Sequence, residues 1–333
     1  MLVEFDSDQR LWGKTVRDLL AKECSPVWVR QVVDDGVDPS PLWRTYVEQG
    51  FTELTDAGDA VELAIALEAM GAATDPTPFL ATVTQFAPLA GALGDPGRPG
   101  AAVSKGVSAH LSDGGWVLSG TCRTVLDGDR AEQFAIATAA GVFVVPADGV
   151  IVTRVPSFDP LLHIADVTFP SLRVDDSQRN PVSDVGRAAA TALMGLSITM
   201  VGACQRILDL ALEHVRNRQQ FGVAIGSFQA VKHKAADMHV AIERARALAY
   251  YSALTIATDS PDVRLAASMA KASAGECQSI VFRNGYQLFG AMGYTWENDL
   301  QFPLKRAKAG ELMLGGTDEH RALITEEYRA AQV

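Results

Sequence analysis

The stretch NRQQFGVAIGSFQ, from Asn217 to Gln229, joins two long segments of helical periodicity and is the point from which the fold can be worked out. Apolar residues recur at helical spacing before it, from Leu193 to Ala211, and after it, from Phe228 to Leu248. Glycines interrupt the stretch, and Ser227 stands where a helix N-cap is expected. The sequence therefore predicts two long helices joined by a short turn.

Further helices are predicted on both sides of this pair. Val263 to Phe289 is a third long helical segment that ends at Gly290, and four-helix-bundle packing buries such apolar stripes. Near the N-terminus, Leu11 to Glu23 is amphipathic, whereas Ala60 to Ala73 is apolar on nearly all sides and predicts a buried helix. Three prolines and a glycine-rich run are then expected to break the helical pattern, namely Pro76, Pro78, Pro88 and Gly94 to Gly100.

Between these helical parts, residues 101–174 consist of short β-type runs separated by glycine and proline. The turn Asp113-Gly114-Gly115 between two such runs predicts a hairpin, and the whole region predicts a small antiparallel sheet. We therefore expect a mainly α fold with a small β domain. Its parts are an N-terminal helical domain (1–98), a central β domain (99–180) and a C-terminal four-helix bundle (181–333).

Composition excludes several classes of partner. Apolar residues make up 48% and charged residues 21%, and the net charge is -11 with no basic cluster, which disfavours nucleic acid and anionic membrane surfaces. The cysteines are far apart, so neither a disulfide framework nor a metal site is expected. The N-terminal residues lack the pattern of a signal peptide, and no uninterrupted apolar run predicts a membrane span. We expect a cytoplasmic protein.

The stretch after Asn217 also carries candidate chemistry. An arginine at a helix end beside loop amides, as Arg218 is, can hold a pyrophosphate, and an aromatic ring such as that of Phe221 can pack on a flat cofactor. The alternative is a structural turn, in which Arg218 neutralises the helix C-terminus and Gly222 permits the reversal. The residues of this stretch alone leave both interpretations open.

Several spaced motifs together resemble the acyl-CoA dehydrogenase family. The stretch from Arg218 to Gln229 resembles its RxxFG…FQ signature, and YQLFGAMGYTWENDLQFPLKRAK, from Tyr286 to Lys308, resembles its QxxGGxGY segment with the arginine that follows. The helical, β, helical order matches as well. The resemblance implies an acyl-CoA dehydrogenase-like α–β–α fold and binding of FAD. It also implies oxidation of acyl-CoA thioesters to 2,3-enoyl-CoA, in which a carboxylate removes the α-proton.

The chain departs from this family where the chemistry is done. The catalytic glutamate of many members corresponds to Gly315, and the alternative position on an earlier helix corresponds to about Ala192, so the resemblance leaves no catalytic base. The residues that cover the flavin ring are replaced by Thr124-Val125-Leu126. The family's TEP…GSD stretch is replaced by the shorter AAVSKGVSAH, and the aspartate after the bundle arginine is Ala307.

The cofactor-binding residues that the resemblance implies are Arg218, Phe221, Gln229, Gln287, Gly290 and Thr317. Apart from Thr317, they correspond to those with which a family member completes the FAD site of a neighbouring subunit. The resemblance therefore implies the base-less subunit of a heterotetrameric α2β2 acyl-CoA dehydrogenase of steroid side-chain or other bulky acyl-CoA catabolism. It would share FAD with a homologous catalytic subunit, meet acyl-CoA through the complex and pass electrons to an electron-transfer acceptor.

Two alternatives remain. The chain could be a self-sufficient homomeric dehydrogenase with an atypical base, for which Glu311, Asp318 and Glu319 are the candidates. Asp318 and Glu319 also have a structural explanation, because acidic residues are favoured in the first turn of a capped helix and Thr317 precedes them. The second alternative is a flavin-free scaffold that retains only the fold. The sequence does not identify the acyl chain of a substrate.

Overall fold

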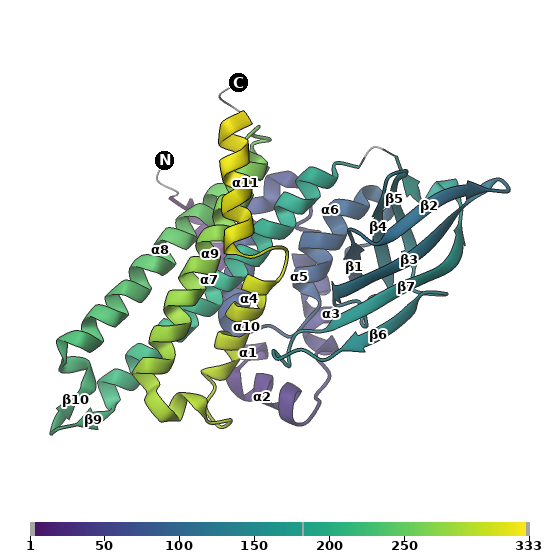
Figure 1. Ribbon diagram of the computed structural model, residues 1–333. Coiled ribbons are helices and arrows are strands. Elements are labelled where there is room, and N and C mark those ends of the chain that lie inside the picture. Colours follow the sequence, from purple (N-terminus) through teal and green to yellow (C-terminus); the bar gives the residue numbers. More distant parts are fainter. Residues whose placement is uncertain (1–3, 182, 331–333) are drawn as a thin grey trace. The chain divides into compact units, whose positions relative to one another are not determined.

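The computed structural model describes residues 4–181 and 183–330, which form two compact units built from separate stretches of chain (Figure 1). Residues 4–37, 60–75 and 193–330 form the helical unit, and residues 38–59, 76–181 and 183–192 form the mixed unit. The order of helices, then strands, then helices along the chain is the predicted one. The ranges 1–98, 99–180 and 181–333 stay a prediction of domain organisation.

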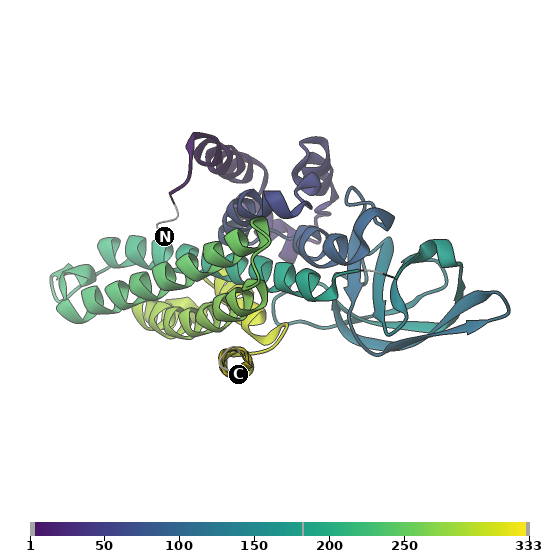
Figure 2. The same ribbon diagram turned by 90° about the horizontal axis from the view of Figure 1, so that it is seen from above.

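Helices of the helical unit pack along their length, and α8 and α9 run side by side in both views (Figures 1 and 2). The short elements β9 (Gln219–Gln220), β10 (Val223–Ala224), η6 (Ile225–Ser227) and η7 (Gly290–Tyr294) connect the long ones. The helices are α1 (Ser7–Glu23), α2 (Pro26–Asp34), α4 (Ala60–Ala73), α7 (Val185–Asn217, of which the part from Leu193 belongs here), α8 (Gln229–Ala257), α9 (Val263–Phe289), α10 (Gln301–Leu312) and α11 (Thr317–Ala330).

The long helices begin and end largely where the sequence predicts. The third one is confirmed as α9, and Gly290 follows its last residue with a φ of +60°, a conformation that glycine adopts without strain. The predicted N-cap of α8 is wrong. Ser227 donates its hydroxyl to the Ala224 carbonyl (2.7 Å), Phe228 takes the N-cap position without a side-chain cap, and the helix begins at Gln229.

Helices α4 and α7 cross with their backbones in close approach. A Cβ atom at Gly202 of α7 would lie less than 3.0 Å from the Glu68 carbonyl oxygen of α4. A Cβ atom at Gly71 of α4 would lie equally close to the Thr199 carbonyl oxygen of α7. The prediction that α4 is buried is confirmed, because this contact and its apolar side chains remove most of its surface from solvent.

Helix α7 is also apolar enough to be compared with a membrane span. It contains an 18-residue window of mean hydropathy 1.4, which satisfies the length and composition of such a span although polar residues interrupt its apolar run. That window is 83% buried within the protein, as in the core helix of a bundle. Among the described residues it is the one helix that meets these criteria.

The mixed unit contains a helical segment that the prolines were expected to break. α5 (Phe79–Ala81), the π turn η3 (Thr82–Phe86) and α6 (Ala87–Ala90) follow one another, so the expectation for Pro88 is wrong. The Ala87 amide bonds the Thr82 carbonyl five residues back, and this widened turn lets Pro88 stand at the start of α6. The remaining helices of this unit are α3 (Ser40–Glu48), η1 (Phe51–Glu53), η2 (Ala57–Asp59), η4 (Gly91–Leu93) and η5 (Asp176–Gln178).

Two four-stranded sheets, and not one, make up the β part of the mixed unit. Their strand orders are β1-β4-β5-β8 and β2-β3-β7-β6. The predicted hairpin at Asp113-Gly114 is confirmed, and the pairs are antiparallel apart from β1 with β4, which is parallel. Phe134 and Phe169, one from each sheet, meet edge to face at 6.0 Å in the shared core. The strands are β1 (Gly100–Val103), β2 (Val107–Ser112), β3 (Gly115–Leu126), β4 (Gln133–Thr138), β5 (Gly141–Pro146), β6 (Ile151–Val155), β7 (Ile164–Val174) and β8 (Arg179–Asn180).

Candidate functional site

The turn between α7 and α8 presents its residues outward. β9 and β10 pair across a two-residue tip formed by Phe221 and Gly222, which both have positive φ angles of 55° and 81°. The Ile225 amide donates to the Arg218 carbonyl (2.9 Å) and closes the loop. A positive φ at a bulky residue such as Phe221 is uncommon, and here the two-residue hairpin turn requires it.

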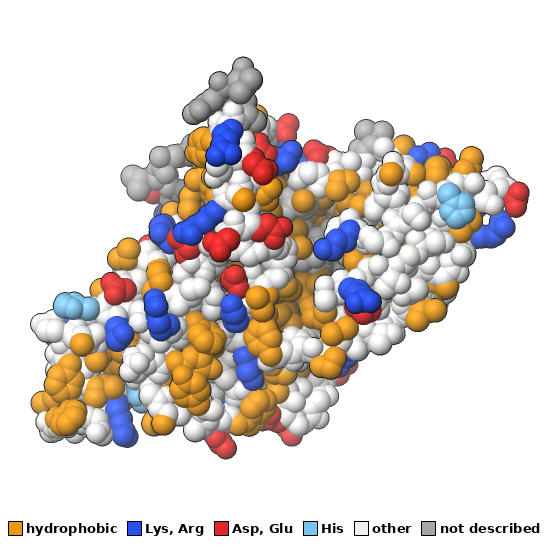
Figure 3. Space-filling model, in the orientation of Figure 1, with side chains coloured by type: hydrophobic (Ala, Val, Ile, Leu, Met, Phe, Trp, Pro, Cys, Tyr) orange, Lys and Arg blue, Asp and Glu red, His pale blue; other side chains and the backbone are white. Residues whose placement is uncertain are grey.

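The side chains at this turn are exposed to solvent, which is uncommon for a phenylalanine. Phe221 is 92% exposed, and its ring packs edge to face with that of Phe228, at 6.1 Å between centroids. Arg218 and Gln229 are also exposed. The side chain of Arg218 makes no hydrogen bond or ion pair with any residue in the described part of the chain. Figure 3 shows hydrophobic side chains gathered at this β9–β10 end of the bundle, where Val223 is exposed as well.

The end of α9 lies at the same end of the bundle. The rings of His214, in the last turn of α7, and Phe289, the last residue of α9, stack at 4.4 Å. Burial and, next, the charge of Arg218 lower the pKa of His214, which favours the neutral form of the imidazole. Gln287 and Gly290 are exposed beside Phe289. Five of the six predicted cofactor residues are therefore brought to one end of the bundle.

Thr317 is not part of that group. It opens α11 and lies against Gly275 of α9, where a Cβ would collide with its hydroxyl oxygen. Gly275 precedes Gln287 by twelve residues, which corresponds to roughly 18 Å along an α-helix. The prediction that acidic residues follow Thr317 in the first turn is confirmed by Asp318 and Glu319. Within this chain Thr317 therefore lies at a separate location, where the turn between α10 and α11 ends.

That turn, which contains Gly315, is hydrogen-bonded to a buried lysine. The Lys271 side chain, 0% exposed, donates from Nζ to the carbonyl oxygens of Gly315 (2.6 Å) and Glu311 (3.2 Å). Burial lowers the pKa of Lys271 to about 8, against the opposing influence of the Glu311 and Glu319 charges. The sequence analysis missed this residue, although a single lysine among the small residues of LAASMAKASAGE is a signal for it.

Neighbouring side chains fill the space that a side chain at Gly315 would enter. His320 is buried, and its Nε2 lies 2.8 Å from the Leu314 carbonyl oxygen. A Cβ at Gly315 would lie 3.0 Å from His320 Nε2 and 3.0 Å from the Glu319 carboxylate, and the φ of Gly315 is +90°. Glu311 forms an ion pair with Lys308 (2.8 Å). The turn has no carboxylate on Gly315 itself and little room for one.

Ala192 and Thr124 to Leu126, which were also singled out in the sequence, lie in the mixed unit. Ala192 is buried in α7 and offers only a methyl group. Thr124 stands at a bulge of β3 with a φ of +58°, and its amide donates to the Asp166 carboxylate (3.1 Å). Val125 packs into the core between the sheets. No group of three metal-ligating side chains occurs among the described residues, which bears on metal sites in that part of the chain only.

Comparisons with known proteins show what these features resemble. Residues 190–328 match the model of the family described as acyl-CoA dehydrogenase, C-terminal domain. The acyl-CoA dehydrogenase IpdE2 of Mycolicibacterium smegmatis is 30% identical over 334 aligned positions, which cover 96% of this chain and 98% of that protein.

Two solved structures share the fold. The ChsE4-ChsE5 complex from Mycobacterium tuberculosis matches with a TM-score of 0.88 at 23% identity, over 99% of both chains. The structure described as the Tcur3481-Tcur3483 steroid ACAD matches with a TM-score of 0.86 at 22% identity, over 98% of this chain and 99% of the other.

Proposed function

This chain belongs to the acyl-CoA dehydrogenase family, and from that premise we propose that it is the base-less subunit of a heteromeric member. In this proposal it completes the FAD site of a catalytic partner and does not abstract the substrate proton itself. The α,β-dehydrogenation of an acyl-CoA thioester would then take place at the partner's own base. The observation that carries the proposal is the Gly315 turn.

Proton abstraction needs a carboxylate within hydrogen-bond reach of the substrate α-carbon. At Gly315 the chain has no side chain, and Lys271 fixes the backbone of the turn through its carbonyl oxygen. His320 and Glu319 occupy the volume that a longer side chain would enter. At the alternative position Ala192 is a buried methyl group. These contacts support the proposal that the chain has no catalytic base at this turn.

The residues at the β9–β10 end of the bundle fit the outer part of a dinucleotide. Arg218 is a charged donor with no internal hydrogen bond or ion pair among the described residues, and it suits a diphosphate. Phe221 offers an exposed ring for a flat group, and Gln229 and Gln287 offer neutral donors. A Cβ atom at Gly290 would meet no other atom within 4 Å, so there is open space beside this residue. FAD supplies the hydride acceptor when it is bound, and these side chains would bind and orient it.

A homologous catalytic subunit is the proposed partner. The two solved structures described above, ChsE4-ChsE5 and Tcur3481-Tcur3483, each combine two differently named proteins in one assembly, and the latter is described as a steroid ACAD. They support assembly with a homologous partner, for which we propose an α2β2 composition and a steroid side-chain or other bulky acyl-CoA as substrate. Electrons would leave through an electron-transfer acceptor, and we place the complex in the cytoplasm.

One observation favours a second candidate, the self-sufficient dehydrogenase. The Glu319 carboxylate lies 3.0 Å from where a side chain at Gly315 would begin, close to the position of the family's base. Glu311 is less suitable because Lys308 pairs with it, and the side chain of Asp318 is almost fully exposed. The scaffold alternative is disfavoured because a chain that keeps only the fold would not need both Arg218 and Gln287 at one end of the bundle.

Expression of the chain alone and with its partner tests the proposal. We expect the isolated chain to bind little flavin and to show no turnover with a panel of acyl-CoA thioesters and an artificial electron acceptor. The complex should carry flavin and turn over. The measurement is the ratio of flavin to protein absorbance, followed by an anaerobic assay. Robust turnover by the isolated chain, abolished by Glu319→Gln, would establish the second candidate instead.

Restoring the family's acid is expected to fail. Gly315→Glu should yield no activity in the isolated chain and should lower its free energy of unfolding by about 1–3 kcal/mol. The reasons are the positive φ, the two 3.0 Å contacts and the like charge of Glu319. Gly222→Ala, also at positive φ but with open space around it, is the matched control for backbone strain alone. An active and equally stable Gly315→Glu chain would contradict the turn described above.

A further inference from the structure

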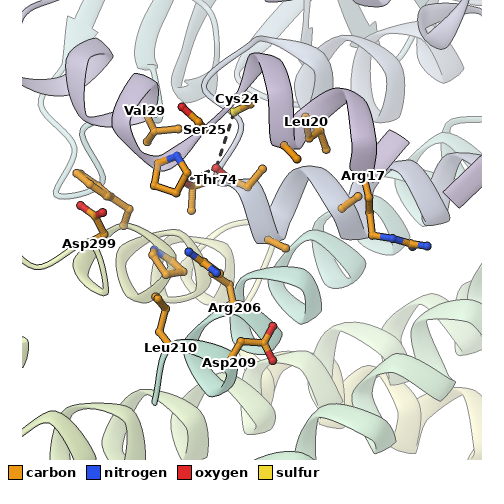
Figure 4. A pocket seen from close by; sticks show the side chains of 17 residues that line it. Arg17, Leu20, Cys24, Ser25, Val29, Thr74, Arg206, Asp209, Leu210 and Asp299 are labelled. Atoms are coloured by element: carbon orange, nitrogen blue, oxygen red, sulfur yellow. Dashed lines mark hydrogen bonds between the residues drawn. The ribbon is translucent and has the colours of Figure 1, made fainter. Parts of the chain in front are cut away.

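A cavity of about 310 Å³ lies in the helical unit (Figure 4). The residues of α7 that line it are Arg206, Asp209 and Leu210, which precede the turn of Arg218 along the chain. Helices α1, α2, α4, α7 and α10 contribute its walls. Its volume is at the lower end of the range for small-molecule sites, which are mostly apolar with a few placed polar groups. None of the predicted cofactor residues lines it.

The walls are apolar over most of their area. α1 contributes Leu20, α2 contributes Val29, α4 contributes Ala69, and Phe302 from α10 adds an aromatic ring. Cys24 is buried, with its thiol directed to the Ala73 carbonyl at 3.9 Å, and burial raises its pKa well above the ordinary value. A neutral thiol is a small apolar group, so this wall also favours hydrocarbon.

One cation enters this apolar space. Figure 4 shows Arg206 of α7 reaching from the helix toward Thr74, into the cavity, whereas Arg17 lies at its edge. Arg206 is half-buried, and across residues 4–181 and 183–330 its guanidinium has no hydrogen bond or ion-pair partner. A half-buried guanidinium with unused donors is costly to keep unless a bound anion or water meets them.

The carboxylates at the cavity do not neutralise Arg206. Asp299 accepts two hydrogen bonds from Arg30, at 3.1 and 2.6 Å. Asp209 accepts from Gln205 at 2.8 Å, and in Figure 4 its carboxylate is directed away from Arg206. The charge that faces the cavity is therefore positive. We propose that the cavity binds a small amphiphilic monocarboxylate, with its carboxylate on Arg206 and its hydrocarbon against Leu20, Val29 and Phe302.

A chain-length series on the unaltered 333-residue protein is the first test. Acetate, butyrate and hexanoate are titrated against it by ligand-observed NMR, with hexanol and hexylamine as the uncharged and cationic counterparts of hexanoate. Each methylene that enters the apolar wall should strengthen binding by about fourfold. Hexanol and hexylamine should bind at least tenfold more weakly than hexanoate, because neither offers an anion to Arg206.

Two variants separate the charge from the walls. Arg206→Gln should weaken hexanoate binding by about 10- to 100-fold. Ala69→Leu should also abolish it while leaving Arg206 in place, because the larger side chain occupies the cavity. Arg216→Gln, on the exposed last turn of the same helix, is the matched control and should bind as the unaltered protein does.

The outcomes are distinct. Equal binding of acetate and hexanoate, or of hexanoate and hexanol, overturns the proposal, as does unchanged hexanoate binding in Arg206→Gln. If Arg206→Gln fails to fold by circular dichroism, the chain-length series and Ala69→Leu still decide. These experiments measure carboxylate binding and not flavin content. Their outcome therefore neither supports nor contradicts the proposed role as a subunit.

Discussion

Gly202→Leu is expected to prevent the chain from reaching its folded state, and Gly202→Ala is expected to lower the free energy of unfolding by about 3 kcal/mol. The physical reason is that a Cβ at Gly202 meets the backbone of α4, not a movable side chain. Alanine would otherwise favour the helix by about 1 kcal/mol over glycine, so the contact must outweigh that gain. Urea unfolding of the purified chain, followed by circular dichroism, measures the difference.

The control for this prediction is on the same helix. Gly186 in the first turn of α7 is exposed, and a Cβ there would meet only the Asp184 carboxylate at an ordinary 3.4 Å. Gly186→Ala should therefore leave stability unchanged or raise it slightly. Gly71→Ala, on the α4 side of the crossing, should resemble Gly202→Ala. A Gly202→Ala chain as stable as the unaltered one would show that the two helices can move apart at little cost.

The same crossing illustrates what sequence reasoning can and cannot reach. Periodicity predicts that α4 and α7 exist and that α4 is buried, because those properties depend on residues close together in the chain. It does not predict that Gly71 and Thr199 meet, since that pairing depends on packing between segments far apart in sequence. Likewise Asp113-Gly114 identifies a hairpin, whereas the parallel pairing of β1 with β4 has no local signal.

Errors at helix ends also have local causes that a pattern does not resolve. Ser227 is of the right type for an N-cap, but its hydroxyl is used within its own turn. Pro88 is of the right type for a helix break, but the π turn before it removes the conflict. For the candidate site, motif spacing singled out Arg218 and Gln287, which the structure shows as exposed residues at one end of the bundle, and their role in binding FAD stays a prediction. Lys271 and Arg206 belong to no sequence motif. Their properties depend on the burial of Lys271 and on the cavity that Arg206 lines, and both result from packing between distant segments.

Arg218→Ala is expected to lower the affinity of the heteromeric complex for FAD by about tenfold to hundredfold while this chain still folds. The expectation depends on the proposed role, in which Arg218 meets the diphosphate of an FAD bound to the partner. A charge-assisted hydrogen bond of that kind contributes about 1.5–3 kcal/mol. Because Arg218 makes no internal hydrogen bond or ion pair with the described residues, its removal leaves no orphaned partner within the chain. The ratio of flavin to protein absorbance of the co-purified complex is the measurement.

The competing role of Arg218, a cation that merely stabilises the C-terminal end of α7, predicts something different. It gives a loss of about 0.3–1 kcal/mol in unfolding free energy and unchanged flavin content. Arg216→Ala is the matched control, since Arg216 is an exposed cation in the last turn of the same helix. Gln287→Ala should lower flavin content less than Arg218→Ala does, because its hydrogen bond is neutral. Full flavin occupancy in Arg218→Ala, equal to that in Arg216→Ala, would refute a role in a partner's FAD site and leave only helix stabilisation.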